Sequence, residues 1–227
     1  MPFTATLAGV MNAFARIMWG AVSDRRLAVH RVLWAERRRR GFRRPHDDGA
    51  GLGSGRLRRQ GLTQEEFGAA AIGHVRYATS GKTVLRNVQP LFVELESGGF
   101  ALAHNGNLTN AQVLRRMLVH RGCLFQSTTD TEVIVHLMAT ARGGSVLDRL
   151  VEAVRQVEGA FSLIALAEGM VIGVRDPWGV RPLVLGRCGD APVLASETCA
   201  LDIIGADFVR DIEPGELVVL DSSGVHS

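Results

Sequence analysis

Three parts of the sequence carry side chains that could hold a small zwitterion and polarise a carbonyl group. Asn105 and Gly106 offer a side-chain amide beside an unscreened backbone N–H, and two such donors aimed at one point form an oxyanion hole. Arg76 can grip a carboxylate through two parallel hydrogen bonds, with the hydroxyl of Thr79 nearby in the sequence. Asp130 can accept an ammonium group. Together these residues predict a site that binds a free amino acid by both ends.

Each of these residues also fits an ordinary structural role. Asn-Gly is a common turn pair, and the hydroxyl of Thr79 suits a turn as well. Arg76 could form a surface ion pair, and Asp130 could cap a helix. The combination of the four features favours the binding site.

The hydrophobic pattern places these residues at the ends of strands and helices. Apolar residues recur one turn apart in three stretches, which predicts helices at residues 109–120, 130–142 and 145–157. Ser145 and Asp148 have the spacing of a capping box. Strands are predicted at residues 70–76, 90–95, 98–103, 161–167, 170–175, 182–186, 192–196 and 216–221, with Asn105-Gly106 as a loop before the first helix. Strands, helices and strands again indicate an α+β domain with layered antiparallel sheets.

Six motifs carry a resemblance to a known family. They are GHVRYATSG at residues 73–81, LAHNGNL at 102–108, TDTE at 129–132, RDPWGVRPL at 175–183, ASETCALD at 195–202 and RDIEPGE at 210–216. The chain resembles, from about residue 67 to 221, the class II glutamine amidotransferase domain, and the last three motifs resemble its amidophosphoribosyltransferase branch. The resemblance implies an N-terminal-nucleophile hydrolase fold, a four-layer α/β/β/α sandwich. It also implies hydrolysis of glutamine to glutamate and ammonia, which a second domain uses in the first step of purine synthesis.

The resemblance implies a role for each candidate residue. Arg76 would hold the α-carboxylate of glutamine, with Thr79 helping, and Asp130 would hold its α-ammonium group. Asn105 and the N–H of Gly106 would form the oxyanion hole.

The family's nucleophile has no obvious counterpart in this sequence. In the family it is a cysteine at the mature N-terminus, whereas this chain has no cysteine before Cys123. Cys188 and Cys199 fall in motifs that are not catalytic, and Thr4 is a weak alternative nucleophile. We therefore expect a glutaminase domain with impaired hydrolysis, or alternatively a non-catalytic glutamine-binding or regulatory subunit.

The first 60 residues differ in composition from the rest. They hold thirteen arginines and four acidic residues, whereas residues 61–227 hold thirteen basic and nineteen acidic residues. The composition favours a poorly ordered segment over a basic arm for nucleic acid or acidic lipid. A reading-frame shift in a GC-rich gene would also explain the arginine run. We therefore divide the chain into an atypical Arg-rich segment at residues 1–60, disordered or out of frame, and an amidotransferase domain at residues 61–227.

Other features bound the expected cofactors and partners. Asn12 and Arg16 interrupt the apolar stretch 5–22, which disfavours a membrane span. Three widely spaced cysteines suit a reducing cytoplasm and form no zinc set. We expect no nucleic-acid partner and no metal or cofactor here, because Mg²⁺ and any iron–sulfur cluster would belong to a phosphoribosyltransferase domain that this chain lacks. We expect glutamine as the ligand and a phosphoribosyltransferase domain or chain as the partner. We expect full-length members of the family to be homo-oligomers.

Overall fold

The structure is a computed structural model that describes residues 18–22, 34–35, 70–74 and 85–227. In chain order its elements are β1 (Met18–Val22), β2 (Trp34–Ala35), β3 (Ala70–His74), the 3₁₀ turn η2 (Leu85–Asn87), β4 (Leu91–Leu95), β5 (Gly98–Leu108), α2 (Ala111–His120), α3 (Thr131–Thr140), α4 (Val146–Val154), β6 (Gly159–Ala167), β7 (Met170–Arg175), β8 (Val184–Cys188), β9 (Ala191–Ala195), α5 (Thr198–Ile204), β10 (Asp207–Asp211), β11 (Leu217–Asp221) and β12 (Gly224–His226).

The strands form two antiparallel sheets. The first has the order β10-β8-β9-β1-β3-β2, and the second has the order β12-β11-β7-β6-β5-β4. β1 and β2 fall within the segment 1–60, where the sequence predicted no strand. The rest of that segment lies outside the described residues, so its predicted disorder stays a prediction.

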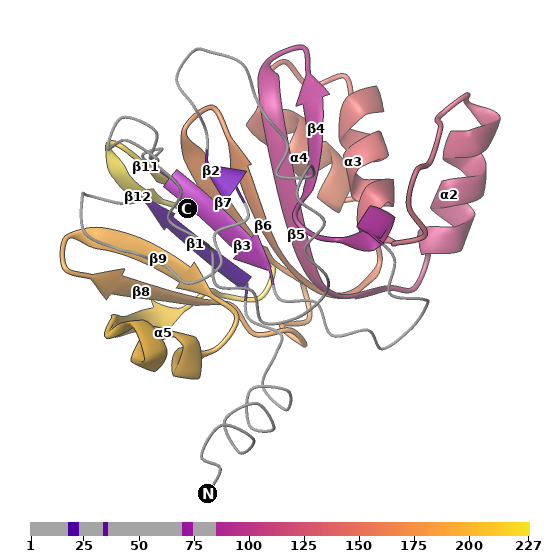
Figure 1. The fold of residues 1–227 in the computed structure, drawn as a ribbon. Helices are drawn as coiled ribbons and strands as arrows, with labels where there is room; N and C mark the ends of the chain where they lie inside the picture. The colour runs from indigo at the N-terminus through magenta and orange to yellow at the C-terminus, as the bar shows by residue number, and fades with distance from the viewer. Residues whose placement is uncertain (1–17, 23–33, 36–69, 75–84) are drawn as a thin grey trace, which may run out of the picture.

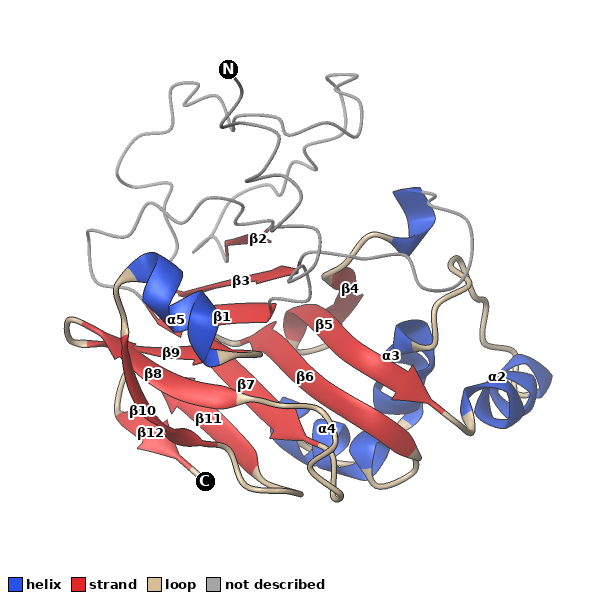
Figure 2. Ribbon diagram, turned by 90° about the horizontal axis from the view of Figure 1, so that it is seen from below, coloured by secondary structure: helices blue, strands red, loops and turns tan. Residues whose placement is uncertain are grey.

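Three apolar clusters define four layers. Aliphatic side chains such as Ala103, Ile164 and Leu194 fill the space between the two sheets. A larger cluster lies between the second sheet and α3 and α4, and a smaller one lies between α5 and β8 and β9. Figure 1 and Figure 2 show α5 on the outer face of one sheet and α3 and α4 on the outer face of the other. The predicted α/β/β/α sandwich with antiparallel sheets is therefore confirmed.

Local sequence signals explain several of these elements. Ser145 and Asp148 form the predicted capping box, because the Ser145 hydroxyl accepts a hydrogen bond from the Asp148 N–H and the Asp148 carboxylate accepts one from the Ser145 N–H. The predicted hairpin of β6 and β7 turns at Glu168 and Gly169, which both have positive φ angles. Both φ angles suit the tight turns that join neighbouring strands.

Candidate functional site

Asn105 and Gly106 lie inside a strand and not in the predicted loop. β5 continues to Leu108, and in its ladder with β6 Asn105 pairs with Ser162 and Gly106 pairs with Phe161. The φ angle of Gly106 is +144°, and a Cβ atom there would lie 2.0 Å from the Ala160 carbonyl oxygen. The strand can therefore continue past Asn105 only because residue 106 has no side chain.

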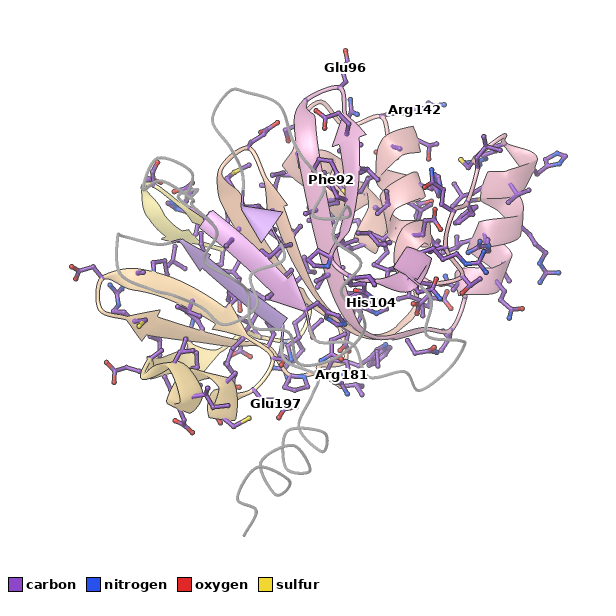
Figure 3. All side chains as sticks on the ribbon, viewed as in Figure 1. Phe92, Glu96, His104, Arg142, Arg181 and Glu197 are labelled. Atoms are coloured by element: carbon purple, nitrogen blue, oxygen red, sulfur yellow. The ribbon has the colours of Figure 1, made fainter. Side chains whose placement is uncertain are left out.

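The side chains of β5 alternate between two layers of the sandwich. Ala101 and Ala103 belong to the cluster between the sheets, so strand alternation directs Asn105 to the same face. His104 points the other way, toward the helices, because its Nδ1 lies 3.2 Å from the Thr131 hydroxyl at the start of α3. Figure 3 shows His104 toward the lower end of β5, opposite the β4–β5 turn that Glu96 marks. Residues from both layers therefore meet at one end of the strand.

One edge of β5 presents backbone N–H groups at this end. β4 pairs with β5 only as far as Leu102, and the described residues place no strand on this edge beyond it. The N–H of His104 donates to the Gln89 side-chain oxygen at 2.7 Å, and that of Leu108 donates to the Asp130 carboxylate at 2.9 Å. Because alternate N–H groups of a strand share an edge, the N–H of Gly106 projects between these two.

Asp130 does not act as the side-chain cap that its position suggested. It is the N-cap residue of α3, but its carboxylate makes no cap hydrogen bond to the helix. Instead it turns to the end of β5, where it accepts from the Leu108 N–H and lies 3.5 Å from His104 Nδ1. Partial burial raises the pKa of Asp130, but the hydrogen bond and charge of His104 and the Leu108 N–H more than offset this, so its pKa lies below the usual value. Asp130 is thus a negative charge that remains about one quarter exposed at the end of β5 that also carries Gly106.

Neighbouring polar residues hold the chain that carries Asp130. The Asn87 side chain exchanges two hydrogen bonds with Thr128, one with its hydroxyl and one with its N–H. The Glu132 carboxylate accepts from the N–H groups of Gln126 and Ser127 and from the Ser127 hydroxyl, each at 2.7 Å. The loop before α3 is therefore fixed from both sides, which limits the positions open to Asp130.

Arg76 and Thr79, the two predicted carboxylate ligands, lie outside the described residues. The description of that segment stops at His74, the last residue of β3. Their roles stay predictions. Of the predicted site residues, the structure thus brings Asn105, Gly106 and Asp130 to the same end of β5.

A second loop at the same end of the sheet was not singled out as functional from the sequence. Arg175 pairs with Ser162, which in turn pairs with Asn105, so the three side chains share a face on adjacent strands. The Arg175 guanidinium donates to the carbonyl groups of Gly179, Arg181 and Ile212.

The buried carboxylate of Asp176 holds the same loop from the other side. It accepts from the N–H groups of Trp178, Val180 and Arg181 at 2.9–3.1 Å. The exposed Trp178 therefore stands on a rigid turn. The RDPWGVRPL motif marked this loop in the sequence, but only as a family signature.

The three cysteines lie away from the layer between the sheets. Cys123 packs against the cluster under the helices, and Cys188 packs against the cluster under α5. Cys199 lies in α5, where burial, followed by the nearby carboxylates of Glu197 and Asp202, raises the pKa of its thiol. A raised pKa lowers the thiolate fraction and therefore the nucleophilicity of this residue.

Two features are absent from the described part of the chain. There, no three His, Cys, Asp or Glu side chains gather as a metal-binding group. Within the same residues, every helix is too short or too polar to cross a bilayer.

Comparisons of the chain with known proteins identify its family. A family model for the glutamine amidotransferase domain matches residues 74–202. Amidophosphoribosyltransferase of Rhizobium etli is 53% identical over 154 residues, which cover 68% of this chain and 31% of that protein. The Bacillus subtilis enzyme is 43% identical over 178 residues, which cover 74% of this chain and 37% of that protein.

A solved structure agrees. Glutamine phosphoribosylpyrophosphate amidotransferase of B. subtilis, complexed with ADP and GMP, superposes with a TM-score of 0.66 and 42% identity over 70% of this chain and 34% of that one. The chain therefore spans about a third of the length of these relatives. It belongs to the class II glutamine amidotransferase family and corresponds to the amidotransferase domain of amidophosphoribosyltransferases.

Proposed function

We propose that the end of β5 is a glutamine-binding site and that the chain acts as the glutaminase domain of an amidophosphoribosyltransferase. One observation carries the proposal: the Asp130 carboxylate makes no cap hydrogen bond to its own helix and instead accepts from the Leu108 N–H, on the edge of β5 to which the Gly106 N–H also projects. A partly exposed carboxylate in that position can accept the α-ammonium group of an amino acid.

The remaining contacts follow from the positions of the other residues. The Asn105 side-chain amide and the Gly106 N–H are the proposed donors to the oxygen of the ligand's side-chain carbonyl. Arg76, with Thr79, is the proposed partner of the ligand's α-carboxylate. Glutamine carries an α-ammonium, an α-carboxylate and a side-chain amide, so it satisfies all three groups.

Hydrolysis needs a nucleophile in addition to this pocket. The sequence has no cysteine before Cys123, and the three cysteines that it has lie outside the layer that Asn105 faces. We therefore propose that this chain binds glutamine and hydrolyses it poorly. The position of the cysteines also favours a second candidate, a non-catalytic glutamine-binding or regulatory subunit.

The proposal extends to partners in the way that the relatives suggest. The ammonia would pass to a phosphoribosyltransferase domain or chain for the first step of purine synthesis, in the cytoplasm. Mg²⁺ and any iron–sulfur cluster would belong to that partner, and full-length proteins of this kind would be homo-oligomers.

Calorimetry with glutamine tests the pocket. Asp130→Asn removes the charge at nearly constant volume, and the lost charge-assisted hydrogen bond should weaken glutamine binding by about 10- to 100-fold. Asp202→Asn is the matched control, because Asp202 is an exposed residue of α5 in the outermost layer on the other side. Equal affinities of the wild-type chain and Asp130→Asn would refute the site.

An ammonia-release assay separates the two candidate functions. Ammonia released from glutamine by the purified chain, and lost in Asn105→Ala, supports the glutaminase. Binding without release supports the non-catalytic subunit.

A further inference from the structure

His104 is a buried polar residue beside Asp130 whose ring is only half satisfied. The residue is 4% exposed, and its Nδ1 lies 3.2 Å from the Thr131 hydroxyl and 3.5 Å from Asp130 Oδ1. Its other ring nitrogen, Nε2, is buried and has no hydrogen-bond partner in the described part of the chain. Burying an unpaired nitrogen costs stability, so packing alone does not explain a histidine here.

The groups that surround the ring of His104 favour one position for its proton. Gln89 accepts from the His104 N–H through its oxygen, so its amide nitrogen is the donor to the Thr131 hydroxyl at 3.1 Å. That hydroxyl has a second lone pair, so it can accept a hydrogen bond from His104 Nδ1 at 3.2 Å. The other atom in front of Nδ1 is an anionic carboxylate oxygen of Asp130, which repels a bare lone pair and attracts an N–H. The Asp130 carboxylate therefore favours a proton on Nδ1, and the Thr131 hydroxyl can accept a hydrogen bond from the same N–H.

We propose that His104 is a positioning residue that holds the Asp130 carboxylate where it receives the α-ammonium group of the ligand. This inference rests on the proposed glutamine site and adds a residue to it. The Leu108 N–H donates to Oδ2 of Asp130, and the ring Nδ1–H of His104 points toward Oδ1, so each oxygen has a partner that orients it. Gln89 and Thr131 in turn hold the ring of His104. The distance of 3.5 Å is long for a hydrogen bond, and such contacts can shorten when a ligand occupies the site.

Two amide variants separate positioning from packing. The side-chain nitrogen of asparagine, like Nδ1 of histidine, is bonded to Cγ, so His104→Asn can keep the donor to Asp130. His104→Gln carries its amide one atom farther out, in the place of Nε2, and loses that donor. Both variants bring a carboxamide group into the same buried site. Any loss of folding stability from that group is therefore common to both variants, and thermal melts measure it.

The ligand pair makes the test specific for the α-ammonium group. Glutaramate is glutamine with a hydrogen atom in place of that group, so its affinity should not depend on Asp130. We expect His104→Gln to weaken glutamine binding about tenfold and His104→Asn to weaken it less than about threefold, with glutaramate affinity unchanged in both. Equal losses for the two ligands, or for the two variants, would overturn the inference while leaving the glutamine site standing.

A measurement without ligand keeps the two hypotheses separate. Nitrogen-15 NMR of labelled histidine should show Nδ1 of His104 protonated and Nε2 bare, and Asp130→Asn should change the Nδ1 signal. A wild-type chain that binds no glutamine refutes the proposed function. In that case the tautomer of His104 still tests the contact between His104 and Asp130, and a ring protonated on Nε2 would overturn this contact.

Discussion

Gly106→Ala is the sharpest test of the geometry at the end of β5. A Cβ atom at residue 106 would lie 2.0 Å from the Ala160 carbonyl oxygen and 2.8 Å from the Phe161 Cα, both of which are backbone atoms of β6. Real Cβ contacts stay beyond 3.0 Å, so the two strands would have to separate by about 1 Å. Gly98→Ala is the matched control, because Gly98 lies on the same strand with a φ angle of +118° and has nothing within 4 Å of its Cβ position.

The two substitutions share one cost and differ in another. Placing alanine at a positive φ angle costs on the order of 1–3 kcal/mol at either position. Only Gly106→Ala also disrupts the ladder with β6, and loss of about two backbone hydrogen bonds adds about 2 kcal/mol. We therefore expect Gly106→Ala to lower the free energy of unfolding by about 2 kcal/mol more than Gly98→Ala does. For a chain of this size, that difference corresponds to about 4–8 °C in Tm.

Urea unfolding followed by circular dichroism measures both variants against the wild-type chain. The Tm values from thermal melts give a second comparison. If Gly98→Ala and Gly106→Ala lose the same stability, the close approach of β5 and β6 at Ala160 is wrong, and with it the reason for a glycine at the proposed oxyanion donor.

Three further outcomes follow from contacts described above. Asp176→Asn keeps one acceptor oxygen for three N–H donors and should lower stability by about 1.5–3 kcal/mol in urea unfolding, and an unchanged midpoint would contradict the role of this carboxylate. Ser145→Ala removes the cap of α4 and should cost about 1 kcal/mol, whereas the exposed Ser222→Ala should stay within about 0.5 kcal/mol. Because the folded-state pKa of Asp130 lies below its unfolded value of about 3.9, its contribution to stability is complete above that pH and is lost as the pH falls through the folded-state pKa. The stability gap between the wild-type chain and Asp130→Asn should therefore shrink between pH 7 and pH 3, and a gap that widens would be inconsistent with the lowered pKa.

Elements with strong local signals were predictable from the sequence. The three long helices and the hairpin of β6 and β7 lie where periodicity and turn residues placed them. Short strands with weak patterns were missed. β10 alternates poorly and has a register shift between Phe208 and Arg210, and β12 has three residues. β1 carries no alternating pattern, and its strand character depends on its partners β3 and β9.

The candidate site was predictable in its residue types but not in its geometry. Asn-Gly usually marks a turn, and only the pairing of Gly106 with Phe161 shows that this pair continues a strand. The position of Asp130 before a helix suggested a cap. Sequence spacing does not reveal that its carboxylate accepts from the Leu108 N–H and makes no cap hydrogen bond. His104 stood within the recognised motif, yet its contacts come from η2–β4 and α3, which are remote in sequence.

The edge of β5 has a consequence for association between chains. An unpaired strand edge presents a row of backbone N–H and C=O groups. Another extended chain can pair with them, and such pairing is a common start of aggregation. In the described part of the chain, the side chains of Gln89 and Asp130 already accept from the N–H groups of His104 and Leu108 on this edge. Among the described residues, only the Gly106 N–H lies between these two, and one amide is too short a row to pair with another strand. The two side chains that flank the Gly106 N–H thus leave this donor for a small ligand and also prevent the edge from pairing with a strand of another chain.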